Sequence, residues 1–159
     1  MKYIIICFIL LSSCDKNAEV MPSPVAEVEQ SDKEMERIAE NARRALPTFF
    51  RNLARPEAGA DNFYIKYPIS GDDEGIEQVW LGDIRVKDGV YYGRLANTPS
   101  LAAGNKKDKL ITFDPDKITD WMYIQDKKII GGQSIKYLLE KIPEEKRRED
   151  QRKILKMFE

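Results

Sequence analysis

Histidine is absent from the 159 residues, and cysteine occurs only at Cys7 and Cys14. Without imidazole, this chain cannot supply a Ser-His-Asp triad or a Cys-His pair. The same absence excludes a zinc site with imidazole ligands. Because no remaining side chain ordinarily titrates near neutral pH, acid–base catalysis would require a strongly shifted carboxyl, Lys or Tyr pKa. We therefore expect no metal, no cofactor and a function that is not enzymatic.

A basic excess is also missing. The 26 Lys and Arg residues are balanced by 27 Asp and Glu residues, which leaves a formal net charge of -1. Nucleic-acid binding requires a clear excess of positive charge on one face, so we expect no nucleic-acid partner. The length is typical of one domain with short extensions, and 42% hydrophobic residues are enough for a soluble core.

The N-terminal apolar run is too short to cross a membrane. Tyr3 to Leu11 would form a helix of about 14 Å, less than half the thickness of the hydrocarbon layer. Lys2 before it and small residues after it are typical of a secretory signal. Leu11-Ser12-Ser13-Cys14 resembles the bacterial lipobox, which implies that residues 1–13 are removed and Cys14 is lipidated. The alternative is an ordinary signal peptide whose cleavage site precedes a cysteine.

Residues 14–30 are predicted to be the lipidated cysteine and a flexible tether, because the segment is polar and contains Pro22 and Pro24. This organisation places the protein on the periplasmic face of the bacterial cell envelope, attached to the membrane by its lipid. Asp15 resembles an inner-membrane retention signal, so the inner membrane is the expected location where that rule applies. Residues 31–159 would then form a single domain.

The domain is predicted to be α+β, with an antiparallel sheet of five to six short strands between N-terminal and C-terminal helices. Ser31 begins a helix with a capping box, and Pro47 should end or kink it near Ala45 or start a second helix, 47–53. Ser134 is the expected cap of a later helix, and Pro143 the first residue of a last one. The pattern leaves open whether the sheet closes on itself. The expected strands are 63–67, 78–86, 90–95, 110–113, 120–125 and 128–130.

Five short motifs resemble the YegJ-like bacterial domain of unknown function. They are Phe63-x-x-Lys66, Gln78-x-Trp80-Leu81, Gly93-x-Leu95-x-Asn97-x-Pro99, Ile118-x-Asp120-Trp121-Met122 and Gly131-Gly132-x-Ser134-Ile135. The resemblance extends from roughly Ala42 to Arg147. That family often has histidine before the Trp motif, where this chain has Gln78. The resemblance implies fold boundaries and no established activity.

Two carboxylates are candidates for chemistry or ligand contact. Asp120 stands beside Trp121, and Asp83 lies in the second expected strand. Each could instead cap a turn or pair with a nearby cation. A hydrolase that uses both would require them to lie about 5–9 Å apart.

The remaining candidates could form a binding surface. Trp80 and Trp121 could make an aromatic platform for a glycan or peptide, or bury their rings in the core. Gly131-Gly132 before a helix could cradle an anion, or provide a tight turn that lets the helix pack on the sheet. Asn97 belongs to the same set through its motif.

These features favour an envelope lipoprotein that presents a binding module to a protein or peptide partner. One alternative is a carboxylate-based hydrolase of an envelope polymer that uses Asp83 and Asp120. Another is a toxin-neutralising, immunity-like protein.

Overall fold

The computed structural model describes residues 33–70, 75–99 and 104–159. The predicted signal peptide, Cys14, the tether and the capping box at Ser31 lie outside these residues. The described elements are α1 (Lys33–Ala54), β1 (Ala60–Ser70), β2 (Ile76–Lys87), β3 (Val90–Leu95), β4 (Leu110–Phe113), η1 (Pro115–Lys117), β5 (Asp120–Gln125), β6 (Lys128–Gly131), α2 (Gln133–Lys141), η2 (Glu144–Lys146) and α3 (Glu149–Lys156).

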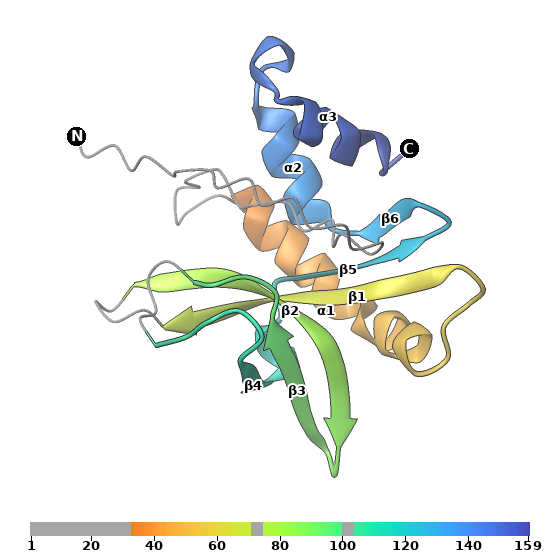
Figure 1. The fold of residues 1–159 in the computed structure, drawn as a ribbon, viewed down its shortest axis with the longest axis vertical. Coiled ribbons are helices and arrows are strands. Elements are labelled where there is room, and N and C mark those ends of the chain that lie inside the picture. The colour runs from red at the N-terminus through yellow and green to blue at the C-terminus, as the bar shows by residue number, and fades with distance from the viewer. Residues whose placement is uncertain (1–32, 71–74, 100–103) are drawn as a thin grey trace.

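The strands form one antiparallel sheet in the order β4-β3-β2-β1-β5-β6. Its two edges are β4 and β6, so the sheet is open in the part of the chain that the structure describes. The prediction of α+β, with helices before and after an antiparallel sheet, is confirmed. The helices and the sheet are seen together in Figure 1.

Each face of the sheet is covered by helices, because side chains of alternate strand residues point to opposite faces. One core cluster joins Ile65 and Leu81 of the sheet to Phe49 of α1. The other joins Tyr64 and Trp80 to residues of α2 and α3, including Leu139. Residues 120–125 contribute side chains to both clusters, so both faces of β5 are covered.

The sheet forks between β1 and β2. The two strands pair from Ser70 with Ile76 to Ile65 with Leu81, and beyond that point β2 pairs only with β3. A β-bulge interrupts β2 between Gly82 and Arg85, and another irregularity interrupts β1 between Asp61 and Tyr64. In Figure 1 the β2–β3 hairpin consequently projects away from the β1, β5 and β6 strands. The fork creates space between strands that would otherwise be neighbours.

The predicted helix end near Ala45 and the predicted second helix 47–53 are wrong, because α1 is a single helix that contains Pro47. A proline inside a helix costs about 3 kcal/mol relative to alanine. Leu46 and Phe49, on either side of the proline, are buried in the core, whereas Pro47 itself is exposed. Burial of the flanking turns holds the helix together across a residue that local propensity would place at its end.

Three other local predictions also require correction. The first strand does not end before Pro68, because β1 extends to Ser70. At Pro68 this strand pairs only with β2, so the missing N–H of the proline leaves no group of β5 without its partner. Ser134 is not the cap of α2; the cap is Gly132, with a left-handed backbone. The last helix does not begin at Pro143, since this residue caps the 3-10 turn η2 and α3 begins only at Glu149.

Candidate functional site

The fork holds a pocket of about 360 Å³, here called the fork pocket. Leu53, Phe63, Ile84 and Leu95 supply its apolar lining. About half of the lining surface is polar, and polar groups in a pocket fix the orientation of a bound ligand. The remaining lining residues are Asn62, Tyr64, Gly82, Asp83, Arg94, Ala96 and Asp108.

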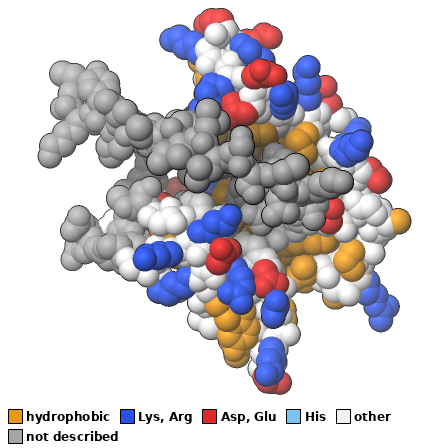
Figure 2. All heavy atoms as spheres, in the orientation of Figure 1, with side chains coloured by type: hydrophobic (Ala, Val, Ile, Leu, Met, Phe, Trp, Pro, Cys, Tyr) orange, Lys and Arg blue, Asp and Glu red, His pale blue; other side chains and the backbone are white. Residues whose placement is uncertain are grey.

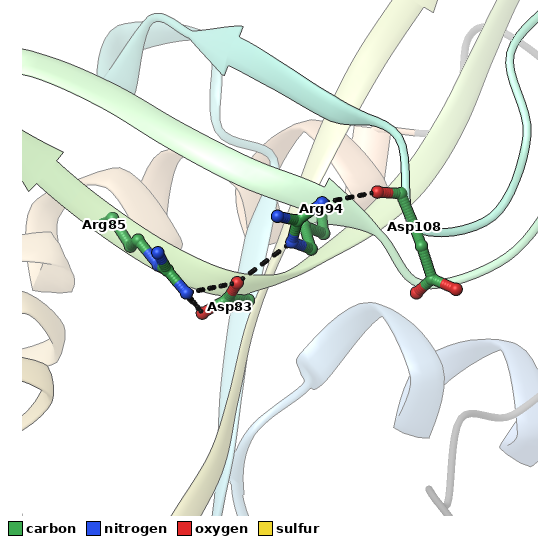
Figure 3. Close-up of polar contacts among 4 residues, drawn as sticks. All are labelled: Asp83, Arg85, Arg94 and Asp108. Atoms are coloured by element: carbon green, nitrogen blue, oxygen red, sulfur yellow. Dashed lines mark hydrogen bonds and ion pairs between the residues drawn. The ribbon is translucent and has the colours of Figure 1, made fainter.

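Asp83 is held at the rim of this pocket in an unusual conformation. Its φ of 46° lies in the left-handed region, within the β2 bulge. Both Arg85 and Arg94 donate hydrogen bonds to its carboxylate, at 2.9 to 3.1 Å. The side chain of Asp83 nevertheless remains 41% exposed. Two guanidinium groups therefore fix a carboxylate that solvent and a ligand can still reach (Figure 3).

Arg94 links the rim of the fork pocket to the loop before β4. Its Nε donates to Asp83, and its Nη1 donates to the backbone oxygen of Asp108 at 2.9 Å. Figure 3 shows the carboxylate of Asp108 turned away from Arg94. The guanidinium is therefore positioned by its own contacts, while the Asp108 carboxylate is left at the rim.

Asp120 lies in a different environment, buried between the sheet and α2. Its Oδ1 accepts from the backbone N–H of Trp121, and its Oδ2 accepts from the backbone N–H of Ser134, both at 2.8 Å. The Nζ of Lys66 donates to the Ser134 hydroxyl at 3.2 Å. Lys66, Asp120 and Ser134 are each at most 7% exposed. A strand carboxylate thus accepts a hydrogen bond from one N–H group at the start of α2 and fixes the helix to the sheet.

Burial shifts both ionisable groups of this cluster toward their neutral forms. Desolvation raises the pKa of Asp120, and hydrogen bonds from Ser134 and Trp121 and the charge of Lys66 oppose that rise. Desolvation lowers the pKa of Lys66, and the charge of Asp120 opposes the decrease. In both groups burial is the largest cause of the pKa shift, so their position in the core disfavours the charged forms.

The two candidate carboxylates do not converge. Asp120 is on β5 and Asp83 on β2, with β1 between them. Two strand spacings and three residues of offset along the strand separate their backbones by roughly 13 Å. One carboxylate bonds to guanidinium groups and the other to backbone N–H groups. This arrangement provides no shared cleft for the paired-carboxylate hydrolysis that the sequence left open.

The two tryptophans face opposite sides of the sheet. Trp80 is 3% exposed and packs in the cluster beneath α2 and α3. Trp121 packs against the other cluster, and its indole N–H donates to the backbone oxygen of Ala42 in α1 at 3.0 Å. A common aromatic platform is therefore not formed by these two rings.

Gly131 and Gly132 make the turn that brings α2 back onto the sheet. Both have positive φ, 83° and 61°. A Cβ at Gly131 would collide with the backbone oxygen of Trp121 and lie 2.7 Å from its ring. The following helical N–H of Ser134 is already bonded to Asp120. The geometry thus matches the tight-turn interpretation, and the helix start is occupied by a carboxylate of the chain itself.

Asn97 lies half-buried in the bend after β3, next to Ala96, which lines the fork pocket.

The sequence did not single out Lys66, Ser134 or Arg94 as site residues. For Lys66 the available signal was its place in a strand rich in apolar residues, because a lysine is buried there only when it has partners. Nothing in the sequence indicated that Arg94 would reach Asp83, because their contact depends on the β2 bulge.

Two further properties concern the described residues as a whole. No helix among them is both long enough and apolar enough to cross a bilayer. Likewise, residues 33–70, 75–99 and 104–159 contain no group of three or more acidic, Cys or His side chains arranged to hold a metal ion. Figure 2 shows Lys, Arg, Asp and Glu side chains interspersed over the visible face of the molecule.

The chain was compared with known proteins. A family model described as an uncharacterized protein conserved in bacteria (DUF2314) matches residues 32–155. The uncharacterized protein YegJ of Escherichia coli strain K12 is 29% identical over 116 residues, which is 73% of this chain and 74% of that protein. A protein of Neisseria meningitidis serogroup B named "Putative ankyrin repeat protein" is 32% identical over 130 residues, 77% of this chain but only 51% of that protein. No solved structure gives a significant match.

Proposed function

The chain belongs to the DUF2314 family of bacterial proteins, and we propose that its domain is a non-enzymatic binding module for a protein or peptide partner. The observation that carries this proposal is the fork pocket, about 360 Å³ with a lining that is part apolar and part polar and with a fixed, exposed Asp83. A backbone outlier held by its surroundings is a recurrent feature of binding sites. The pocket volume lies at the lower end of the range for ligand sites.

The buried cluster supports a binding role over catalysis. Lys66 and Ser134 stand at hydrogen-bonding distance, as a serine nucleophile and a lysine base would. However, Ser134 is 1% exposed in the first turn of α2, so a substrate could reach its hydroxyl only after local unfolding. The cluster is better suited to fixing α2 on the sheet than to turning over a substrate.

One relative offers further support. That protein of Neisseria meningitidis is named a putative ankyrin repeat protein, and ankyrin repeats stack to form extended binding surfaces. This chain matches 51% of its length. A role in protein recognition is consistent with that name.

Selection of peptides tests the binding role directly. We expect a random-peptide display library, panned against the full chain, to yield sequences that bind wild-type protein and bind Asp83→Asn at least 10-fold more weakly. Asparagine keeps the shape and tolerates positive φ, but it loses the charge-assisted bonds to Arg85 and Arg94. Isothermal titration calorimetry measures both affinities.

Asp116→Asn is the matched control, because Asp116 is exposed on η1, outside the fork pocket. This variant should bind as the wild type does. Failure to select any binding peptide, or equal binding by Asp83→Asn, would reject the fork pocket as a recognition site.

We also propose that the module is anchored at the periplasmic face of the cell envelope by a lipid on Cys14. The apolar run and the lipobox-like residues 11–14 support this location. Expressed in bacteria with an alkyne-labelled fatty acid, the wild-type chain should acquire label and enter the membrane fraction, and Cys14→Ser should do neither. Cys7→Ser, the control within the apolar run, should remain labelled. Labelled Cys14→Ser protein would contradict the anchor. For the labelled wild-type chain, density-gradient separation of the two membranes reports whether Asp15 retains the protein in the inner membrane.

A further inference from the structure

A second pocket, of about 390 Å³, lies under the β5–β6 hairpin and is here called the hairpin pocket. Tyr64, Met122, Ile124 and Met157 line it with apolar surface. Methionine side chains are flexible and polarizable, so they adapt to ligands of different shape. This lining is suited to side chains of a polypeptide more than to one rigid small molecule.

The two pockets adjoin each other along β1. Asn62 and Tyr64 line both of them. The irregularity of β1 lies at this point, and Asn62 has a φ of 52° there. The fork pocket and the hairpin pocket therefore meet at Asn62 and Tyr64, and the two compartments together are here called the groove. A bound molecule that occupies both must be extended.

The charges that line the groove are predominantly negative. Asp83 and Asp108 line the fork pocket, and Asp61 and Asp126 line the hairpin pocket. The lining cations are Arg94 and Lys127. Arg94 and Arg85 both bond to Asp83, so these charges compensate one another within the protein. The other lining carboxylates, Asp108, Asp61 and Asp126, are the ones that can face a cationic partner.

Asp61 and Asp126 are both exposed at the hairpin pocket. Asp61 accepts a hydrogen bond from the side-chain amide of Asn62 at 2.9 Å, which is a neutral donor. An apolar floor with carboxylates along its sides is complementary to a segment that carries cationic groups on an apolar or aliphatic stem.

We propose that this groove binds an extended peptide segment with basic residues on both sides of an apolar one. The apolar residue packs near Tyr64, and Lys or Arg side chains reach the carboxylates of the two compartments. This inference rests on the proposed function and specifies its partner: a basic, extended segment of another protein, bound on the sheet beside β1.

Three synthetic nonapeptide pools test the charge of the partner. Each pool has randomised apolar residues at alternate positions and, between them, Lys in the first pool, Gln in the second and Glu in the third. Fluorescence anisotropy with the full chain at physiological ionic strength should show at least 10-fold tighter binding of the Lys pool than of the Gln pool, with the Glu pool weakest.

A double variant, Asp61→Asn with Asp126→Asn, should weaken binding of the Lys pool about 10-fold. Both residues are exposed, and asparagine is nearly the same size, so the fold is retained. Asp116→Asn with Asp150→Asn is the matched control, since it changes the net charge equally at exposed positions outside the groove. This control should bind the Lys pool as the wild type does, which excludes a general effect of net charge.

The outcomes separate this inference from the proposed function. Equal loss in both double variants, or equal binding of the Gln and Lys pools, would overturn the basic partner. If such peptides still lost affinity for Asp83→Asn, the binding module itself would stand. If no pool bound and no library peptide was selected, both proposals would be rejected.

Discussion

Replacing Asp120 by alanine is expected to lower the free energy of unfolding by about 3–5 kcal/mol at neutral pH, the range found when one partner of a buried charged cluster is removed. The change leaves the N–H groups of Trp121 and Ser134 without their carboxylate acceptor. It also leaves the buried Lys66 without a compensating anion. Urea unfolding followed by circular dichroism measures the loss.

The pH dependence of this loss follows from the direction of the Asp120 pKa. Because burial raises that pKa, the native state keeps its proton over a range in which the unfolded state has lost it. The corresponding stability is fully present below the unfolded pKa, about 3.9, and is lost as pH rises through the raised native pKa. The cost of Asp120→Ala should therefore decrease as the pH rises through that window.

Asp116→Ala is the control, because this carboxylate is exposed on η1. It should change stability by less than about 0.5 kcal/mol. Replacing the other charged residue of the cluster, in Lys66→Met, should lower the free energy of unfolding by less than Asp120→Ala does, because methionine fills a similar volume without a charge. A loss below about 1 kcal/mol for Asp120→Ala would show that this cluster does not hold α2 on the sheet.

Gly131→Ala is expected to destabilise the fold by about 2–5 kcal/mol, the sum of two separate costs. An L-residue at a φ of 83° is strained. In addition, the new Cβ would overlap the backbone oxygen of Trp121 and press on its ring. Thermal or urea unfolding, with the indole fluorescence of the protein as the signal, measures the effect.

Gly89→Ala separates the two costs. Gly89 has a similar φ of 76°, but a Cβ there would meet no atom within 4 Å. This variant should therefore lose only the conformational part, about 1–2 kcal/mol. If Gly131→Ala and Gly89→Ala lost the same amount, close packing against Trp121 would contribute nothing.

Local patterns in the sequence predicted most of the strands. β3, β4 and β5 begin and end at the expected residues, because turn residues on either side define each one locally. The hairpin between β2 and β3 turns at Asp88-Gly89, a dipeptide typical of hairpin turns, which explains why the start of β3 followed from local sequence. The α+β class followed from the order of these elements, and the family resemblance from motifs within them.

The continuity of α1 could not be predicted in this way. The local rule for Pro47 is a break, whereas the burial of Leu46 and Phe49 against the sheet outweighs it. The environment of Lys66 is a similar case, since its partner Ser134 lies 68 residues away in the chain. Interactions at such separation have no signature in a single sequence.

The sequence by itself determined the absence of imidazole chemistry and the class of the fold, because residue types and the order of short local patterns are sufficient for both. The tertiary structure decided which carboxylate is which: Asp120 became a buried helix-fixing group and Asp83 an exposed rim group. The reason is physical. Desolvation and partners at distant positions set the role of a charged side chain, and only the folded chain brings those partners into place.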